Sequence, residues 1–190
     1  MNPDNKFTHL DIRKAEMSDL DRVMRVYEIA KKIMVSEGNT SQWQEGYPSR
    51  ELLKEDIEKK QCFVCIDSNN YYENEEDAII GVFVLTGAEE SYENIYDGEW
   101  LDDEPYRIVH RVGSTGDVKG VGQYSIEWSV ENYENIKIDT HEDNIPMQNL
   151  LDKLNFKRCG YITSEVDGTP RIAYQKRKKD MEKEQGEQTA

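Results

Sequence analysis

Residues 106–122 read YRIVHRVGSTGDVKGVG, an apolar stretch followed by a glycine-rich turn and the beginning of an amphipathic run. The pattern predicts a strand over Tyr106–Val112, a turn over Gly113–Lys119 and a helix over Gly120–Asn132. Glycines let successive backbone N–H groups point into one concavity, and a helix start adds partial positive charge. This favours an anion site suited to a pyrophosphate, although a tight turn leading into a helix has the same pattern. The Walker A order and the GxGxxG fingerprint are both absent.

The elements on either side follow from apolar periodicity and capping residues. Ser18 opens a run with a helical apolar stripe that Gly38 ends, and Ser49 precedes a second helical run, so both serines are expected as N-caps. The predicted strands are at 9–14, 61–67, 78–86, 106–112, 136–140, 156–163 and 171–175, and the later helices are at 50–59, 120–132 and 146–154. The order β-α-α-β-β-β-α-β-α-β-β predicts a mixed α/β domain.

The length of 190 residues suits one domain with short appendages. Residues 1–8 are expected to be a flexible N-terminus, 9–176 the domain, and the charged residues 177–190 a loose tail. No apolar run approaches the ~20 residues of a membrane span. The N-terminus also lacks the apolar stretch of a signal peptide, so a cytoplasmic protein is expected.

The three cysteines, Cys62, Cys65 and Cys159, are expected to be buried, reduced thiols. The first two have CxxC spacing, but the residues between them are apolar and strand-like, and no second pair completes a zinc site. No metal site is therefore expected, and reduced thiols are typical of the cytoplasm.

The composition is strongly acidic. With 24 basic and 39 acidic residues, the net charge is −15. Binding to nucleic acid or to an anionic membrane is disfavoured, because both attract basic proteins. A cationic small molecule or a basic peptide suits this charge, but solubility alone could also explain it. Residues 87–105 contain eight acidic residues and no Lys or Arg, and such long connections are often functional or mobile.

The run from Ile12 to Gln175 resembles the GNAT superfamily of acyl-CoA-dependent N-acyltransferases. Three parts carry the resemblance: IRKA at 12–15 before SDL at 18–20, Val112 followed by DVKGVG at 117–122, and DNIPMQNLLDKLNF at 143–156. They are similar to the family's opening motif, its valine and Q/R-x-x-G-x-G/A loop, and its N-x-x-A-x-x-L-Y-x-K-x-G-F segment. The stretch QWQEGYP at 42–48 is also similar to a bacterial subgroup of the family.

The resemblance implies a mostly antiparallel central sheet flanked by helices, with a gap where the strands ending at Val112 and Thr140 splay apart. It implies acetyl-CoA as the acyl donor, with pantetheine in that gap and the thioester carbonyl near the Val112 backbone N–H. The residues expected to bind this cosubstrate are Val112, Val118, Lys119, Gly120, Val121, Gly122, Gln123 and Asn144.

Two departures from the family pattern bear on activity. Asp117 replaces the family's Q/R at the beginning of the loop, and its carboxylate is expected to point outward, away from a pyrophosphate. The family's tyrosine general acid falls on Leu151, which cannot donate a proton to a leaving thiolate. The donor is therefore missing, or water or another residue supplies it.

Amine attack on a thioester needs a base for the ammonium proton. On the strand before Val112, the alternate residues Tyr106, Ile108 and His110 share a face, where members of the family often carry a Glu or a His. His110 is the expected base because histidine titrates near neutrality, and Tyr106 is the second candidate. A structural role for His110 and a water relay are the alternatives. His141, at the end of the next strand, is expected to cap the following turn, and a proton relay is the alternative.

Trp43, Tyr47 and Trp100 lie in irregular segments and are expected to line the acceptor pocket, where their rings could hold an ammonium by cation–π contact. They could instead anchor their loops to the core. The expected function is transfer of an acetyl group from acetyl-CoA to a primary amine of a small molecule or peptide. A homodimer is one assembly that we consider. A catalytically weak acyl-CoA-binding module and an acidic protein-interaction domain are the alternatives.

Overall fold

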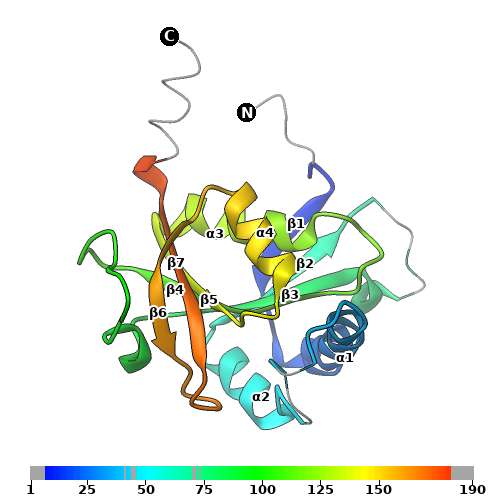
Figure 1. Ribbon diagram of the computed structural model, residues 1–190. Helices are drawn as coiled ribbons and strands as arrows, with labels where there is room; N and C mark the ends of the chain where they lie inside the picture. Colours follow the sequence, from blue (N-terminus) through cyan, green and yellow to red (C-terminus); the bar gives the residue numbers. More distant parts are fainter. Residues whose placement is uncertain (1–6, 41, 44–45, 70–71, 73, 181–190) are drawn as a thin grey trace. The chain divides into compact units, whose positions relative to one another are not determined.

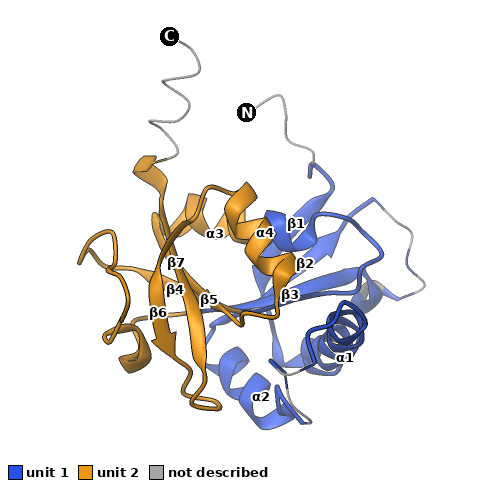
Figure 2. Cartoon of the chain, viewed as in Figure 1, with its two compact units in different colours: residues 1–85, 111–125 blue, residues 86–110, 126–190 orange. Residues whose placement is uncertain are grey.

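The structure of the protein is a computed structural model that describes residues 7–40, 42–43, 46–69, 72 and 74–180 (Figure 1). The chain divides into two compact units, which Figure 2 shows in separate colours. Unit 1 consists of residues 1–85 and 111–125, and unit 2 of residues 86–110 and 126–190. Three elements contribute residues to both units: β3 (Ile79–Thr86), whose last residue is in unit 2, β4 (Arg107–Ser114) and α3 (Val121–Tyr133).

Unit 1 is built from antiparallel strands and two helices. Its elements are β1 (Leu10–Lys14), the 3-10 turn η1 (Met17–Asp19), α1 (Leu20–Ser36), α2 (Arg50–Glu58), β2 (Cys62–Asp67), the 3-10 turn η2 (Glu75–Ala78) and β3 (Ile79–Thr86). β2 pairs antiparallel with both β1 and β3. Val23, Val26 and Tyr27 of α1 are buried in one core with Leu53 of α2 and Val82 of β3. The apolar stripe predicted from the sequence is therefore the face that forms this core.

Of the two serines predicted to cap the first two helices, one does so and the other does not. Ser18 lies inside η1, and Asp19 closes a capping box there by accepting the Glu16 N–H at 2.7 Å. Asp19 is also bonded by the Arg13 guanidinium, at 2.6 Å, and it holds the N-cap position of α1 without a side-chain cap bond. The prediction for Ser18 is therefore wrong. Ser49 caps α2 as predicted, because its side chain accepts a backbone N–H of the first turn at 3.1 Å.

Unit 2 contains the remaining strands and most of α3. Its other elements are the 3-10 turn η3 (Glu90–Tyr92), the first half of β4, β5 (Asn135–Thr140), α4 (Ile145–Lys153), β6 (Lys157–Thr163) and β7 (Pro170–Arg177). β7 pairs antiparallel with β5 and β6, whereas β4 and β5 are parallel. The hydrogen-bonded strand order is β1-β2-β3-β4-β5-β7-β6. The predicted mixed α/β fold with a mostly antiparallel sheet is confirmed.

The parallel pairing of β4 with β5 is short. Two pairs are in register, Arg107 with Ile136 and Ile108 with Lys137, whereas β5 pairs with β7 from Asn135 to Thr140. The register of this pair ends at Ile108, which agrees with the splayed strand pair that the resemblance implies.

The three cysteines are free and buried, as predicted. Burial raises the pKa of both Cys62 and Cys65 to about 12, so these thiols stay protonated at neutral pH. Within the described residues, the His, Cys, Asp and Glu side chains do not gather in a group of three or more that could hold a metal ion. None of the helices in the described part of the chain is long and apolar enough to cross a membrane.

The expected flexible ends fall mostly outside the described residues, which exclude 1–6 and 181–190. Phe7 packs against Tyr124 with ring centroids 5.4 Å apart. Arg177, where the tail was expected to begin, is the last residue of β7, and residues 178–180 are helical. Its guanidinium contacts Asp102 at 2.9 Å and Asp180 at 2.8 Å. The charges of residues 177–190 suggested a solvated tail, but the charge of Arg177 is paired with two carboxylates.

Candidate active site

The glycine-rich turn of unit 1 has the backbone expected of an anion site. Gly116 and Gly120 have φ angles of +81° and +89°, and α3 begins directly afterwards at Val121. The first N–H groups of a helix have no intrahelical partner and can bind an anion. The Thr115 hydroxyl, at the beginning of the turn, is buried and has no hydrogen-bond partner among the described residues. These features fit the pyrophosphate end of a CoA-type cosubstrate.

The predicted cosubstrate residues of unit 1 differ in how far they are buried. Val121 is buried against Val118 and other apolar side chains, whereas Gly122, Gln123 and Val112 are partly buried. Lys119 and Asp117 are exposed, and exposure of Asp117 agrees with the expectation that its carboxylate points away from a ligand.

Gly120 cannot be replaced by a larger residue without strain. A Cβ atom on it would lie 2.5 Å from Cε1 of the Phe7 ring, and its positive φ already disfavours other residues. The turn therefore has its shape because the residue is glycine.

Arg111 was not among the predicted site residues. It lies within β4, at the residue from which this strand belongs to unit 1, and has a φ of +50°. Its guanidinium contacts the Asp56 carboxylate at 2.7 Å and the Tyr47 hydroxyl at 3.3 Å. The Tyr27 hydroxyl donates to its carbonyl oxygen at 2.9 Å. These contacts from α1, α2 and the 42–48 segment fix the strand directly before Val112.

In unit 2, His110 lies among polar side chains of the acidic segment 87–105 and of β5. Its Nε2 is 3.1 Å from Glu89 Oε1, and its Nδ1 is 3.9 Å from Asp139 Oδ1. The side chains of His110 and Glu89 are 17% and 31% exposed, so solvent still reaches them. The Thr86 hydroxyl donates to the same Glu89 oxygen at 2.6 Å. His110 is therefore oriented by its surroundings and remains accessible, as a general base needs to be.

Asp139 is held by a tyrosine and an arginine. The Tyr92 hydroxyl donates to Asp139 Oδ1 at 2.5 Å, and Arg171 Nε lies 3.9 Å from Oδ2. Burial and the Asp139 charge raise the pKa of Tyr92 well above its ordinary value, so this hydroxyl stays a donor. The Tyr92 ring also packs edge-on against His110, with centroids 6.0 Å apart. The Tyr92 ring therefore forms one side of the polar cluster around His110.

Tyr106, the second candidate base, is occupied by another contact. Lys137 Nζ lies 3.6 Å from the centroid of the Tyr106 ring and 3.9 Å from that of Trp100. Burial, followed by the charges of Glu93 and Glu89, raises the pKa of Tyr106. A phenol with a raised pKa is a weaker candidate for a base at neutral pH, which leaves His110 as the stronger one.

Lys137 itself is only 3% exposed, and its desolvation lowers its pKa to about 8. Between pH 8 and the ordinary value of 10.5, the unfolded lysine holds a proton that the folded one does not. Stability therefore rises with pH in this window, and we expect wild type to gain up to roughly 3 kcal/mol relative to Lys137→Met. Urea unfolding across this pH range tests the expectation, with Lys14→Met as the exposed control. A difference between wild type and Lys137→Met that does not change with pH would contradict it.

The predicted substrate aromatics lie in packed surroundings. Trp43 is 8% exposed and contacts the Tyr27 ring edge-on, so its burial favours the alternative in which it anchors its loop. Tyr47 is partly buried and bonded to Arg111 in unit 1. Trp100, in unit 2, stacks on Tyr92 and donates its Nε1–H to the Tyr92 carbonyl at 2.9 Å.

The predicted residues after β5 cap the next turns. Asn144 is the N-cap of α4, and its side-chain oxygen accepts the Met147 N–H at 3.2 Å. His141 Nδ1 accepts the Asp143 N–H at 3.2 Å, which is the capping role expected for it. Leu151, at the position of the family's tyrosine, is fully buried in α4.

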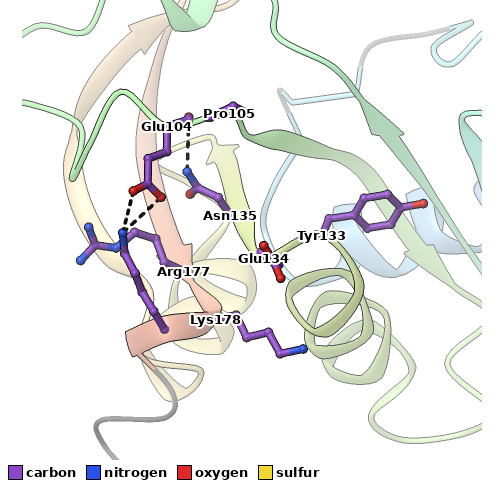
Figure 3. A pocket seen from close by; sticks show the side chains of 8 residues that line it. Glu104, Pro105, Tyr133, Glu134, Asn135, Arg177 and Lys178 are labelled. Atoms are coloured by element: carbon purple, nitrogen blue, oxygen red, sulfur yellow. Dashed lines mark hydrogen bonds and ion pairs between the residues drawn. The ribbon is translucent and has the colours of Figure 1, made fainter.

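A pocket of about 480 Å³ in unit 2 lies at the beginning of β5 (Figure 3). Its lining residues are Glu104, Pro105, Tyr133, Glu134, Asn135, Arg177, Lys178 and Lys179. Three of its cations are already paired: Arg177 with Asp102, Lys179 with Glu104 and Lys178 with Glu131. The three cations of the lining are therefore already paired with carboxylates, and no role in the reaction follows from this pocket.

Sequence reasoning missed Glu89, Tyr92 and Asp139 as members of the His110 cluster. Asp139 follows from strand alternation once the pairing of β4 with β5 is known. Ile108 lies opposite Lys137, so the residues two positions further along, His110 and Asp139, lie on the same face. Glu89 and Tyr92 gave no such signal, since they belong to an irregular segment.

Comparisons with known proteins agree with the fold. A scan against protein-family models gives no match, and a search of curated proteins gives none either. Among solved structures, an acetyltransferase of the GNAT family from Streptococcus agalactiae is 30% identical, with a TM-score of 0.76 over 89% of this chain and 95% of that chain.

More distant structures share the fold. A GNAT superfamily phosphinothricin acetyltransferase from Sinorhizobium meliloti, in complex with acetyl-CoA, is 12% identical, with a TM-score of 0.58 over 89% of this chain and 88% of that chain. Arabidopsis thaliana NAA60, also in complex with acetyl-CoA, is 12% identical, with a TM-score of 0.59 over 90% of this chain and 99% of that chain. With the splayed strands, the glycine turn before α3 and the similarity to the streptococcal protein, the chain belongs to the GNAT family of acetyltransferases.

Proposed function

We propose that the protein transfers an acetyl group from acetyl-CoA to a primary amine of a small molecule or peptide, with His110 as the general base. The observation that carries this proposal is the contact of His110 with Glu89 at 3.1 Å, beside the point where β4 parts from β5. The acidic segment 87–105 supports a cationic acceptor. We also propose that the protein is cytoplasmic. From the sequence of residues 42–48, we further propose that it belongs to the bacterial subgroup with the QW..GYP motif.

The residues proposed to hold acetyl-CoA are Val112 and the loop residues Val118, Lys119, Gly120, Val121, Gly122 and Gln123, together with Asn144. When bound, acetyl-CoA supplies an acyl carbon activated as a thioester. His110 takes one proton from the acceptor ammonium and passes it to solvent, which leaves the amine lone pair free for attack. The second amine proton ends on the released thiol. Because Leu151 cannot donate it, water is the proposed carrier.

The experiment is calorimetric titration with acetyl-CoA, followed by thiol release against a panel of amines. We expect binding that Gly120→Asp abolishes, because the new side chain brings strain and negative charge to the turn. Gly168→Asp is a matched control, since Gly168 also has a positive φ but open space around it. Absence of binding, or binding without thiol release for any amine, would contradict the proposal and favour a weak binding module or an acidic interaction domain.

A further inference from the structure

The two ring nitrogens of His110 are in different situations. Nε2 is 3.1 Å from Glu89 Oε1, which is within hydrogen-bonding distance. Nδ1 is 3.9 Å from Asp139 Oδ1, which is too far for a hydrogen bond. The bond that orients the ring is therefore the one between Nε2 and Glu89.

The chemistry of Glu89 decides where the hydrogen of this bond lies. An ionised carboxylate only accepts hydrogen bonds, so the hydrogen between Nε2 and Oε1 must belong to the ring. The Thr86 hydroxyl, a second donor, also bonds to Oε1, at 2.6 Å. In neutral His110 the proton then lies on Nε2, and Nδ1 carries the lone pair.

We infer that Glu89 is a positioning residue that fixes His110 in the Nε2–H tautomer and thereby makes Nδ1, on the side of Asp139, the atom that accepts the proton of the acceptor amine. The role of Nδ1 as proton acceptor rests on the proposed function, whereas the assignment of the tautomer does not. In the transfer, an N–H bond of the ammonium breaks, its electron pair stays on the amine, and the proton binds the Nδ1 lone pair. The Nε2–H bond to Glu89 stays in place, and Nδ1 later releases the proton to solvent.

Asp139 completes this arrangement. Its charge lies beside the nitrogen that becomes protonated, and the Tyr92 hydroxyl fixes Oδ1 at 2.5 Å. The charged and titratable groups around the ring are Glu89 from the 87–105 segment, Tyr92 from η3 and Asp139 from β5, with Arg171 of β7 beside Asp139. The imidazolium therefore forms between two carboxylates: Glu89, which is hydrogen-bonded to Nε2, and Asp139, which lies 3.9 Å from Nδ1.

Nitrogen-15 NMR of the histidine ring tests the tautomer without any acetyl transfer. The full chain is measured as wild type, Glu89→Gln and Glu89→Lys at a pH where the rings are neutral, and His110→Gln assigns the signal.

We expect the Nε2–H tautomer of His110 in wild type. Glu89→Lys offers only a donor and should move the ring to Nδ1–H, whereas Glu89→Gln keeps an acceptor. His141, whose Nδ1 accepts a backbone N–H, is the internal control and should stay Nε2–H throughout. An Nδ1–H ring in wild type, or no change in Glu89→Lys, would overturn the inference.

Kinetics give the second readout. Glu89→Leu should lower kcat by about 10²- to 10⁴-fold, in the range seen when a base loses its orienting carboxylate, with unchanged affinity for acetyl-CoA. A change in acetyl-CoA affinity with unchanged kcat would contradict a positioning role. If no amine is acetylated by wild type, the proposed function fails while the tautomer measurement still stands.

Discussion

His110→Gln is expected to lower kcat/KM for the acceptor amine by about 10²- to 10⁴-fold, the usual contribution of a general base. Glutamine has a similar reach but no group that takes up a proton near neutral pH. The turn of unit 1 that is proposed to bind acetyl-CoA is unchanged, so the affinity for acetyl-CoA should stay the same. Steady-state thiol release and calorimetry measure the two quantities separately.

His9→Gln is the matched control for this variant. The bonds recorded at His9 are made by its backbone carbonyl, which accepts from the backbone and side chain of Ser68 at 2.8 and 2.9 Å. The substitution therefore leaves them in place, and activity should not change. Full activity in His110→Gln would show that water carries the proton, and the base assignment would then be wrong.

Asp56→Ala is expected to destabilise the protein by about 3–5 kcal/mol, the cost of leaving one member of a buried ion pair without its partner. Arg111 Nη2 and Asp56 Oδ2 are 2.7 Å apart, and their side chains are 13% and 7% exposed. The remaining contact of the guanidinium with Tyr47, at 3.3 Å, cannot replace the lost charge. Urea unfolding monitored by tryptophan fluorescence gives the free energy of unfolding.

Glu55→Ala in the same helix is the control for Asp56→Ala. Glu55 pairs with Lys59 at 3.3 Å on the exposed face of α2, where both side chains are 60% exposed. Exposed pairs contribute about 0–1 kcal/mol, so this variant should be nearly as stable as wild type. Equal losses in the two variants would mean that burial of the Arg111–Asp56 pair does not determine its contribution.

The sequence predicted those features that depend on local pattern. The strand ending near Val112, the turn with Gly116 and Gly120 and the helix after it are all present in the structure, because glycine spacing and apolar periodicity act over a few residues. The cap at Ser49 follows the same rule. His110 was named as a candidate base because alternation along a strand is also local.

Features that depend on distant partners could not be predicted. Ser18 lies inside the turn η1 and does not cap α1, and the Asp19 carboxylate after it is bonded to Arg13 of β1 and to the Glu16 N–H. Trp43 looked like a pocket residue in an irregular segment, but the core around Tyr27 covers it. Glu89 reaches His110 from a position 21 residues earlier in the chain, and no short-range pattern indicates such a contact.

The most direct test of the proposed reaction compares two acceptors that differ only at the reacting atom, a primary aminoalkane and the corresponding alcohol. Each is incubated with acetyl-CoA and the full chain over a range of pH, and the products are identified by mass spectrometry. We predict the amide from the amine, no ester from the alcohol, and a rate of amide formation that rises with pH until the base is fully deprotonated. Ester formation at a comparable rate, or thiol release without an acetylated amine, would contradict transfer to nitrogen.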